Sequence, residues 1–150
     1  MELKVIPIVQ VIIAMALMAA IQSTIPTFAY TLQLSNYISG SLVFIGIIIG
    51  FSAIYSFRKH QTTVNPSKPE SSSTVVNSGI YHYSRNPMYV AMLLALLAYA
   101  FYLENLLAFV ICGVFIWYIS KYQIIPEERM LEKLFGQEYQ HYCQQVRRWI

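Results

Sequence analysis

Two long stretches near the start of the chain contain no charged side chain, and each is long enough to cross a lipid bilayer. Residues 5–25 and residues 37–57 are almost wholly apolar. A helix needs about 20 mostly apolar residues to span the hydrocarbon core of a membrane. Residues 87–103 and 106–122 form a second, shorter pair of apolar stretches. The sequence therefore predicts an all-α, polytopic membrane protein with about four transmembrane helices.

The last two apolar stretches are separated only by Glu104 and Asn105. So short a connection predicts a tight helical hairpin that turns near one face of the membrane. Charged residues make up 11% of the chain, against about 25% in soluble domains, which argues against an ordinary soluble enzyme. With 150 residues the chain has the length of one domain, so residues 1–150 are predicted to form a single membrane domain.

Lysine and arginine gather in two regions, the predicted loop 58–86 and the tail after the fourth span, whereas residues 26–36 contain neither. Because positive charges stay on the cytoplasmic side of a membrane, both basic regions are expected in the cytoplasm. Four spans then place both termini there. The chain shows no obvious sorting signal, and we expect a bacterial or archaeal cytoplasmic membrane.

The composition also limits the possible partners. A net charge of +3 without a dense basic patch argues against nucleic acid. The chain has no aspartate, and Cys112 and Cys143 lie far apart, so neither a metal site nor a disulfide framework is expected. Gly46 and Gly50, four residues apart in the second span, predict a close helix–helix contact. We favour packing within the chain over a dimer through these glycines.

The start of the third span is the first candidate for a functional segment. Asn86 is predicted to be the N-cap residue, with its side chain accepting a backbone N–H, and Pro87 suits the first helical position. Exposed amides at that helix start would offer a seat for a carboxylate or another anion.

The tail, residues 126–150, is the second candidate. Pro126 predicts the start of a new helix whose first turn holds Glu127 and Glu128, and Gly136 predicts a bend that divides the tail into two helices. Apolar residues recur there at steps of three or four. By this pattern alone, the tail would be an amphipathic segment lying on the lipid headgroups.

Two motifs occur in order on either side of the predicted hairpin. They are Gly79-x-Tyr81-x-x-x-Arg85-Asn86-Pro87-x-Tyr89 and Glu127-Glu128-x-x-Leu131-x-x-x-Phe135-Gly136-x-x-Tyr139-x-x-Tyr142-x-x-x-Val146-x-Arg148. The combination resembles the isoprenylcysteine carboxyl methyltransferase family, which is related to the phospholipid methyltransferases. The resemblance covers roughly residues 62–150, whereas residues 5–57 match only as hydrophobic spans.

The resemblance implies an integral membrane enzyme that uses S-adenosylmethionine, bound at the cytoplasmic face, to methylate a lipid or another hydrophobic small molecule. Carried over by position, the cofactor-binding residues are Tyr81, Asn86, Pro87, Tyr89, Glu127, Glu128, Leu131, Tyr139 and Tyr142. The resemblance also implies that Arg85 and one of the two glutamates, which we take to be Glu128, lie nearest the chemistry.

One departure from the family pattern bears on the mechanism. Many members have histidine where this chain has Asn86, and an asparagine cannot accept a proton near neutral pH. The acceptor remains open among an isoprenoid carboxylate, a phospholipid amine and a small thiol. Arg85 can hold a carboxylate or phosphate, and no buried base is evident, which favours a carboxylate or another acceptor that is already ionised.

Two other classes of function compete with this one. A small non-enzymatic membrane protein with an amphipathic tail would have the same spans. A membrane reductase that uses NADPH would need a basic cluster for the 2′-phosphate of that cofactor, and only Arg147 and Arg148 offer one.

Overall fold

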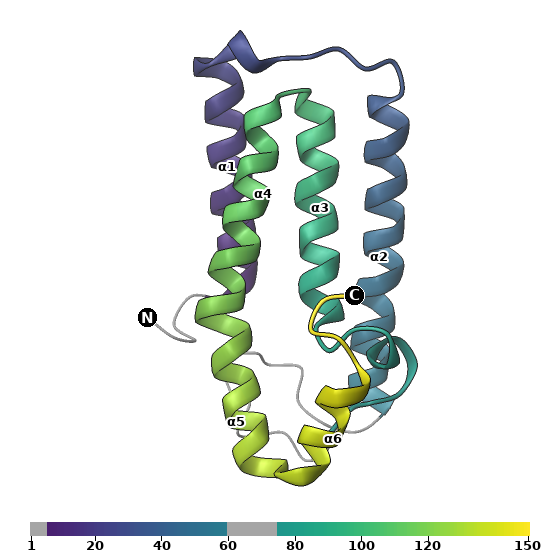
Figure 1. Cartoon of the computed structure of the whole chain (residues 1–150). Coiled ribbons are helices and arrows are strands. Elements are labelled where there is room, and N and C mark those ends of the chain that lie inside the picture. The colour runs from purple at the N-terminus through teal and green to yellow at the C-terminus, as the bar shows by residue number, and fades with distance from the viewer. Residues whose placement is uncertain (1–5, 60–74) are drawn as a thin grey trace.

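The computed structural model describes residues 6–59 and 75–150, and it is built from helices (Figure 1). The long helices are α1 (Pro7–Thr24), α2 (Ser35–Lys59), α3 (Pro87–Leu103), α4 (Leu106–Ile119), α5 (Ile125–Phe135) and α6 (Gln137–Gln145). Short segments join them: the 3-10 helices η1 (Pro26–Phe28) and η3 (Gly79–His82), and the π-helical η4 (Ser120–Ile124). Within the described residues the only β-type pairing is an isolated bridge between Ala29 and Asn105. The all-α prediction is confirmed, while residues 60–74 of the predicted loop lie outside the described ranges.

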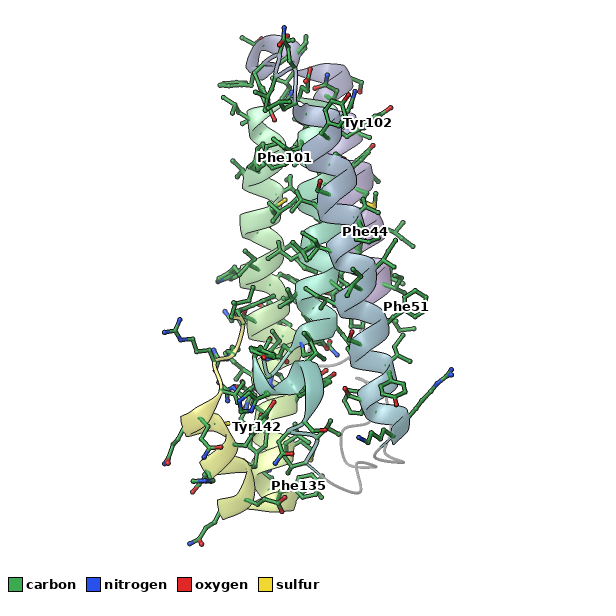
Figure 2. All side chains as sticks on the ribbon, turned by 90° about the vertical axis from the view of Figure 1, so that its right-hand side faces the viewer. Phe44, Phe51, Phe101, Tyr102, Phe135 and Tyr142 are labelled. Atoms are coloured by element: carbon green, nitrogen blue, oxygen red, sulfur yellow. The ribbon has the colours of Figure 1, made fainter. Side chains whose placement is uncertain are left out.

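The four apolar helices stand side by side in the order α1, α4, α3, α2 (Figure 1). Between them lies a core of fully buried side chains that includes Met18, Leu96 and Ile119. On the outside, Phe44 and Phe51 of α2 point away from the bundle (Figure 2). A bundle that is apolar on its inside and its outside is suited to a lipid environment, and the chain is a multi-pass membrane protein.

Three helices have the length and composition of a membrane span: α1, α2, and the continuous helix Leu106–Phe135, in which α4, η4 and α5 join. The predicted bounds of the third span coincide with those of α3, but this helix has only 17 residues. At 1.5 Å per residue it is about 26 Å long, slightly less than the roughly 30 Å of a hydrocarbon core. That α3 crosses the membrane as a fourth span therefore stays a prediction.

The predicted hairpin between α3 and α4 is confirmed, and a buried asparagine holds it. Glu104 adopts the left-handed conformation that reverses the chain, and Asn105 caps α4 by accepting a hydrogen bond from the Leu107 N–H at 3.0 Å. The Asn105 amide donates to Gln22 Oε1 at 2.9 Å. This side chain is fully buried, so the turn is tied to the end of α1.

The two glycines of α2 serve the contact with α3. A Cβ on Gly46 would lie 3.4 Å from the Ala91 carbonyl oxygen and 3.4 Å from Leu94 Cβ, and one on Gly50 would lie 3.6 Å from Ala91 Cβ. Small residues at these positions let the two backbones approach closely. Packing within the chain, the favoured interpretation, is what the structure shows at this helix face.

The helix predicted at Pro126 is observed as α5, which begins at Ile125 and holds Glu127 and Glu128 in its first turn, but it is not separate from the preceding helix. The helix of α4 continues through η4 into α5 without a break. Proline lacks an N–H and its ring crowds the carbonyl four residues earlier. The π-helical turn just before it shifts the hydrogen bonding, because the Ile125 N–H donates to the carbonyl oxygen of Ser120, five residues back. A proline can thereby sit inside a long helix.

The predicted bend at Gly136 is confirmed, since this residue has a φ of +52° between α5 and α6. The apolar face of the tail does not point away from the protein. Tyr139, Tyr142 and Val146 form a buried cluster with Val75, and Leu131 and Phe135 pack against it. The tail is thus folded back onto the bundle beside η3.

Candidate functional site

Three segments meet at the end of the bundle that carries η3 and α6 (Figures 1 and 2). They are η3 with the start of α3, the charged part of α5, and α6 with the residues that follow it. A glycine makes the approach to η3 possible. Gly79 has a φ of +64°, and a Cβ there would lie 3.0 Å from Ser56 Oγ. Only a residue without a side chain fits this turn against α2 without strain.

A charged cluster lies at the centre of this site. The Nη1 atom of Arg85 is 3.3 Å from Glu128 Oε1, and Arg148 binds both oxygens of the same carboxylate, with Nε and Nη2 donating at 3.1 and 2.7 Å. Arg85 also donates to the Cys143 sulfur. The side chains of Arg85 and Glu128 are 13% and 15% exposed, so these charges are largely removed from water. The structure brings together the two residues expected nearest the chemistry.

Glu127 lies beside this cluster but points to a different neighbour. Its Oε1 accepts hydrogen bonds from the Tyr89 hydroxyl at 2.6 Å and from Gln123 Nε2 at 3.1 Å. Glu127 belongs to α5, which follows the apolar helix α4 and lies outside the predicted span of residues 106–122. Burial raises the pKa of Glu127 to about 7, although the hydrogen bonds from Tyr89 and Gln123 oppose the rise. The site therefore contains a buried carboxyl group that can exist in either protonation state near neutral pH.

The C-terminal segment after α6 turns back across the start of α3 (Figure 1). The backbone N–H of Arg85 donates to the Arg147 carbonyl oxygen at 3.0 Å. The side-chain Nδ2 of Asn86 donates to the Arg148 carbonyl oxygen at 2.9 Å. The expected cap is therefore wrong in one respect: Asn86 occupies the N-cap position, but its side chain accepts no backbone N–H. Its amide is occupied by the C-terminal segment, which also covers this helix start, so the expected open anion seat is not observed there.

The tyrosines of the two motifs form the apolar side of the site. The Tyr142 hydroxyl donates to the Tyr81 carbonyl oxygen at 2.7 Å, which ties α6 to η3. Tyr81, Tyr139 and Tyr142 are all buried, and burial is the main reason that the pKa of each hydroxyl is raised. Leu131 packs among these tyrosines, whereas Pro87 is buried as the first residue of α3.

Two residues of this site, Gln123 and Cys143, did not stand out in the sequence, and the ion pair of a third, Arg148, was not expected. Gln123 is one helical turn before Glu127, so the i, i+4 spacing on a helix could have indicated their contact. Arg148 ends the second motif, but its ion pair with Glu128 was not expected, because it depends on the course of the C-terminal segment. Cys143 contacts Arg85 because tertiary packing brings α6 next to the start of α3. No local sequence pattern indicates this contact.

The chemistry available here is that of hydrogen bonding and charge. Among the described residues no group of three or more histidine, cysteine, aspartate or glutamate side chains is placed to hold a metal ion. The Nε of Arg85 is buried and has no hydrogen-bond partner in that part of the chain. An unsatisfied buried donor costs about 1–3 kcal/mol, so this N–H is available to bind an acceptor atom.

Comparison with known proteins assigns a family. The model of the family described as phospholipid methyltransferase matches residues 34–138. An uncharacterized protein of Haemophilus influenzae is 48% identical over 63 residues, which is 42% of this chain and 100% of that protein. No solved structure is significantly similar to the chain.

Proposed function

Because the chain belongs to the phospholipid methyltransferase family, we propose that it transfers a methyl group from S-adenosylmethionine to the amine of a phospholipid. The observation that supports this most directly is the buried pair of acidic residues on α5, one paired with two arginines and the other bonded to a tyrosine. These groups lie at the end of the apolar bundle, where the polar tail meets the predicted membrane spans.

The residues present fit S-adenosylmethionine. This cofactor carries a carboxylate, an ammonium group, ribose hydroxyls and an adenine ring. Arg85 has an unused buried donor for a carboxylate, Glu127 and Glu128 can accept from an ammonium group or from hydroxyls, and Tyr139 and Tyr142 offer aromatic surface. The bound cofactor would supply an electrophilic methyl group on a positively charged sulfur.

The residues of the chain then have the task of holding the acceptor in line and taking up its proton. A phospholipid amine is protonated near neutral pH and must lose a proton before it can attack a methyl group. Glu127 offers a carboxyl oxygen at the boundary between α3 and α5 whose pKa, raised by burial to about 7, suits a group that accepts protons near neutral pH. The buried base that the sequence did not reveal is thus Glu127, and it favours an amine over a carboxylate acceptor.

The competing NADPH-dependent reductase finds less support. Arg148, half of the basic pair that would bind a 2′-phosphate, is engaged in a two-pronged pair with Glu128. The family assignment does not favour a non-enzymatic role.

Ligand binding tests the proposal directly. Detergent-purified protein is titrated by calorimetry with S-adenosylhomocysteine and, separately, with NADPH. We expect saturable binding of S-adenosylhomocysteine only, weakened at least tenfold by Glu128→Ala and left unchanged by Glu132→Ala, an exposed position on the same helix. Labelled methyl transfer into phosphatidylethanolamine vesicles then tests the acceptor. Failure of the folded protein to bind S-adenosylhomocysteine would refute the proposal.

A further inference from the structure

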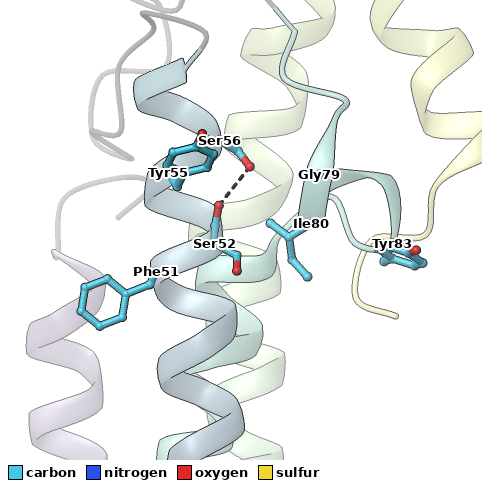
Figure 3. A pocket seen from close by; sticks show the side chains of 7 residues that line it. All are labelled: Phe51, Ser52, Tyr55, Ser56, Gly79, Ile80 and Tyr83. Atoms are coloured by element: carbon cyan, nitrogen blue, oxygen red, sulfur yellow. Dashed lines mark hydrogen bonds between the residues drawn. The ribbon is translucent and has the colours of Figure 1, made fainter.

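A hollow of about 470 Å³ lies on the other side of η3, between this short helix and the last turns of α2 (Figure 3). The α2 side is formed mainly by Phe51, Ser52 and Tyr55, and the opposite side by Ile80 of η3 and Tyr83 just after it. Ser52 and Ile80 face each other across the hollow (Figure 3). We call this hollow the α2–η3 cleft.

The aromatic side chains of the α2–η3 cleft are unusually exposed. Phe51, Tyr55 and Tyr83 are 70%, 69% and 72% exposed, so large apolar surfaces are left for a neighbouring molecule to cover. Tyrosine combines an apolar ring with a polar tip, and it is enriched where hydrocarbon meets lipid headgroups. Tyr55 is expected at the level of the lipid headgroups, because the uncharged stretch of α2 ends at Phe57 and two basic residues follow.

The charges at the end of α2 continue the aromatic surface. Arg58 lies three residues after Tyr55 and seven after Phe51, a spacing that places all three on one face of the helix. Arg58 and Lys59 are both exposed. An apolar helix face, two aromatic rings and then positive charge follow one another over two turns, about 11 Å. A phospholipid has the same order, with acyl chains, a glycerol linkage and a phosphate.

We propose that the α2–η3 cleft is the docking site of the phospholipid acceptor, which enters it from the bilayer. The acyl chains lie along the exposed face of α2, the glycerol linkage lies beside the rings of Tyr55 and Tyr83, and the phosphate points to Arg58 and Lys59. This inference rests on the proposed function for the identity of the lipid as acceptor.

The short helix η3 links the cleft to the candidate site. Ile80 lines the cleft, while the next residue, Tyr81, is buried and accepts the hydrogen bond from Tyr142 with its carbonyl oxygen. The ring of Tyr81 also packs edge-on against Phe57 of α2, with 5.1 Å between ring centroids. A lipid docked in the cleft is therefore separated from the arginine–glutamate cluster by a single turn of 3-10 helix, which its amine must pass before methyl transfer.

Photolabelling tests the docking site. The full-length protein is reconstituted in phosphatidylcholine nanodiscs with a trace of phosphatidylethanolamine that carries a photoactivatable diazirine close to the glycerol. We expect the labelled peptides to map to residues 51–56 and 79–83. Ser52→Leu, which fills the cleft, and Tyr83→Ala, which removes an exposed wall, should each lower this labelling at least fivefold. Labelling spread evenly along the exposed face of α2 would overturn the proposal.

Matched controls give the result its specificity. Ser41→Leu makes the same change at an exposed position of α2 outside the cleft and should label as the wild type does. Replacing Arg58 and Lys59 together by glutamine should reduce labelling by the phospholipid but not by a photoactivatable diacylglycerol, which has no phosphate. Equal effects on both probes would refute the assignment of the phosphate to these residues.

The same samples separate this inference from the proposed function. S-adenosylhomocysteine should bind Ser52→Leu and the wild type with affinities within a factor of two, because the cleft is on the far side of η3. Wild-type binding of S-adenosylhomocysteine without localised labelling would reject the docking site alone. Localised labelling without S-adenosylhomocysteine binding would support the docking site and reject the methyltransferase.

Discussion

The buried carboxyl of Glu127 makes the stability of the protein depend on pH in a direction that can be calculated. Its pKa rises from the ordinary 4.5 to about 7 because burial disfavours the charged form. Between these two pH values only the folded state holds the proton, so the free energy of unfolding falls as pH increases. At about 1.4 kcal/mol for each pH unit, the total loss is about 3 kcal/mol once the pH exceeds 7.

Glu127→Gln should remove this dependence. Glutamine keeps an oxygen that can accept from Tyr89 but has no proton to lose. In matched thermal unfolding series between pH 5 and pH 8, the melting temperature of the wild type should fall relative to that of the variant by roughly 6–12 °C, since 1 kcal/mol corresponds to about 2–4 °C in a chain of this size.

The control for this prediction is Glu132→Gln on the same helix. The Glu132 side chain is exposed and accepts a hydrogen bond from Gln140 at 2.7 Å, so its replacement should leave the pH dependence of the wild type intact. If Glu127→Gln and the wild type gave parallel curves from pH 5 to pH 8, the inference of a buried carboxyl with a raised pKa would be refuted.

Three further substitutions test other parts of the structure, each by thermal or denaturant unfolding in detergent. Glu128→Ala leaves Arg85 and Arg148 without their shared carboxylate; since Arg148 is 39% exposed, we expect a loss of about 2 kcal/mol, below the 3–5 kcal/mol of a fully buried pair, and a much smaller loss for Lys133→Ala, at an exposed position of the same helix, would support the assignment. Gly79→Ala must place a Cβ 3.0 Å from Ser56 Oγ at a φ of +64° and should cost about 1–3 kcal/mol; an unchanged stability would contradict the described turn. Asn105→Ala removes the cap of α4 and the bond to Gln22 and should cost about 2 kcal/mol, whereas Asn77→Ala at an exposed position serves as its control.

The parts of the fold that follow from local chemistry could be predicted from the sequence. The bounds of α3 were predictable because Pro87 begins the helix and Glu104-Asn105 leaves room only for a tight turn. The bend at Gly136 was predictable because glycine tolerates a positive φ. The role of the Asn86 side chain was not predictable, because a carbonyl oxygen 62 residues away competes for it with the local backbone.

The family resemblance grouped residues that the structure brings together, but it did not indicate how they pair. Arg85 and Glu128 were expected near each other from the family resemblance, and they are in contact. The sequence did not indicate that Arg148 shares Glu128, because that pair forms only after α6 and the C-terminal segment fold back across the start of α3. Contacts of this kind depend on tertiary packing rather than on helix periodicity.

The different partners of Glu127 and Glu128 follow from the geometry of one helix. Successive residues of an α-helix are turned by about 100°, so adjacent glutamates cannot face the same neighbour. Glu127 reaches Tyr89 on α3, and Glu128 reaches the two arginines. The π-helical turn of η4 contains a hydrogen bond over five residues instead of four, which shifts the phase of α5 relative to α4 by roughly one residue. Periodicity counted from α4 would therefore be wrong by roughly one residue at the two glutamates, and the proline at position 126 is the sequence feature that signals the shift.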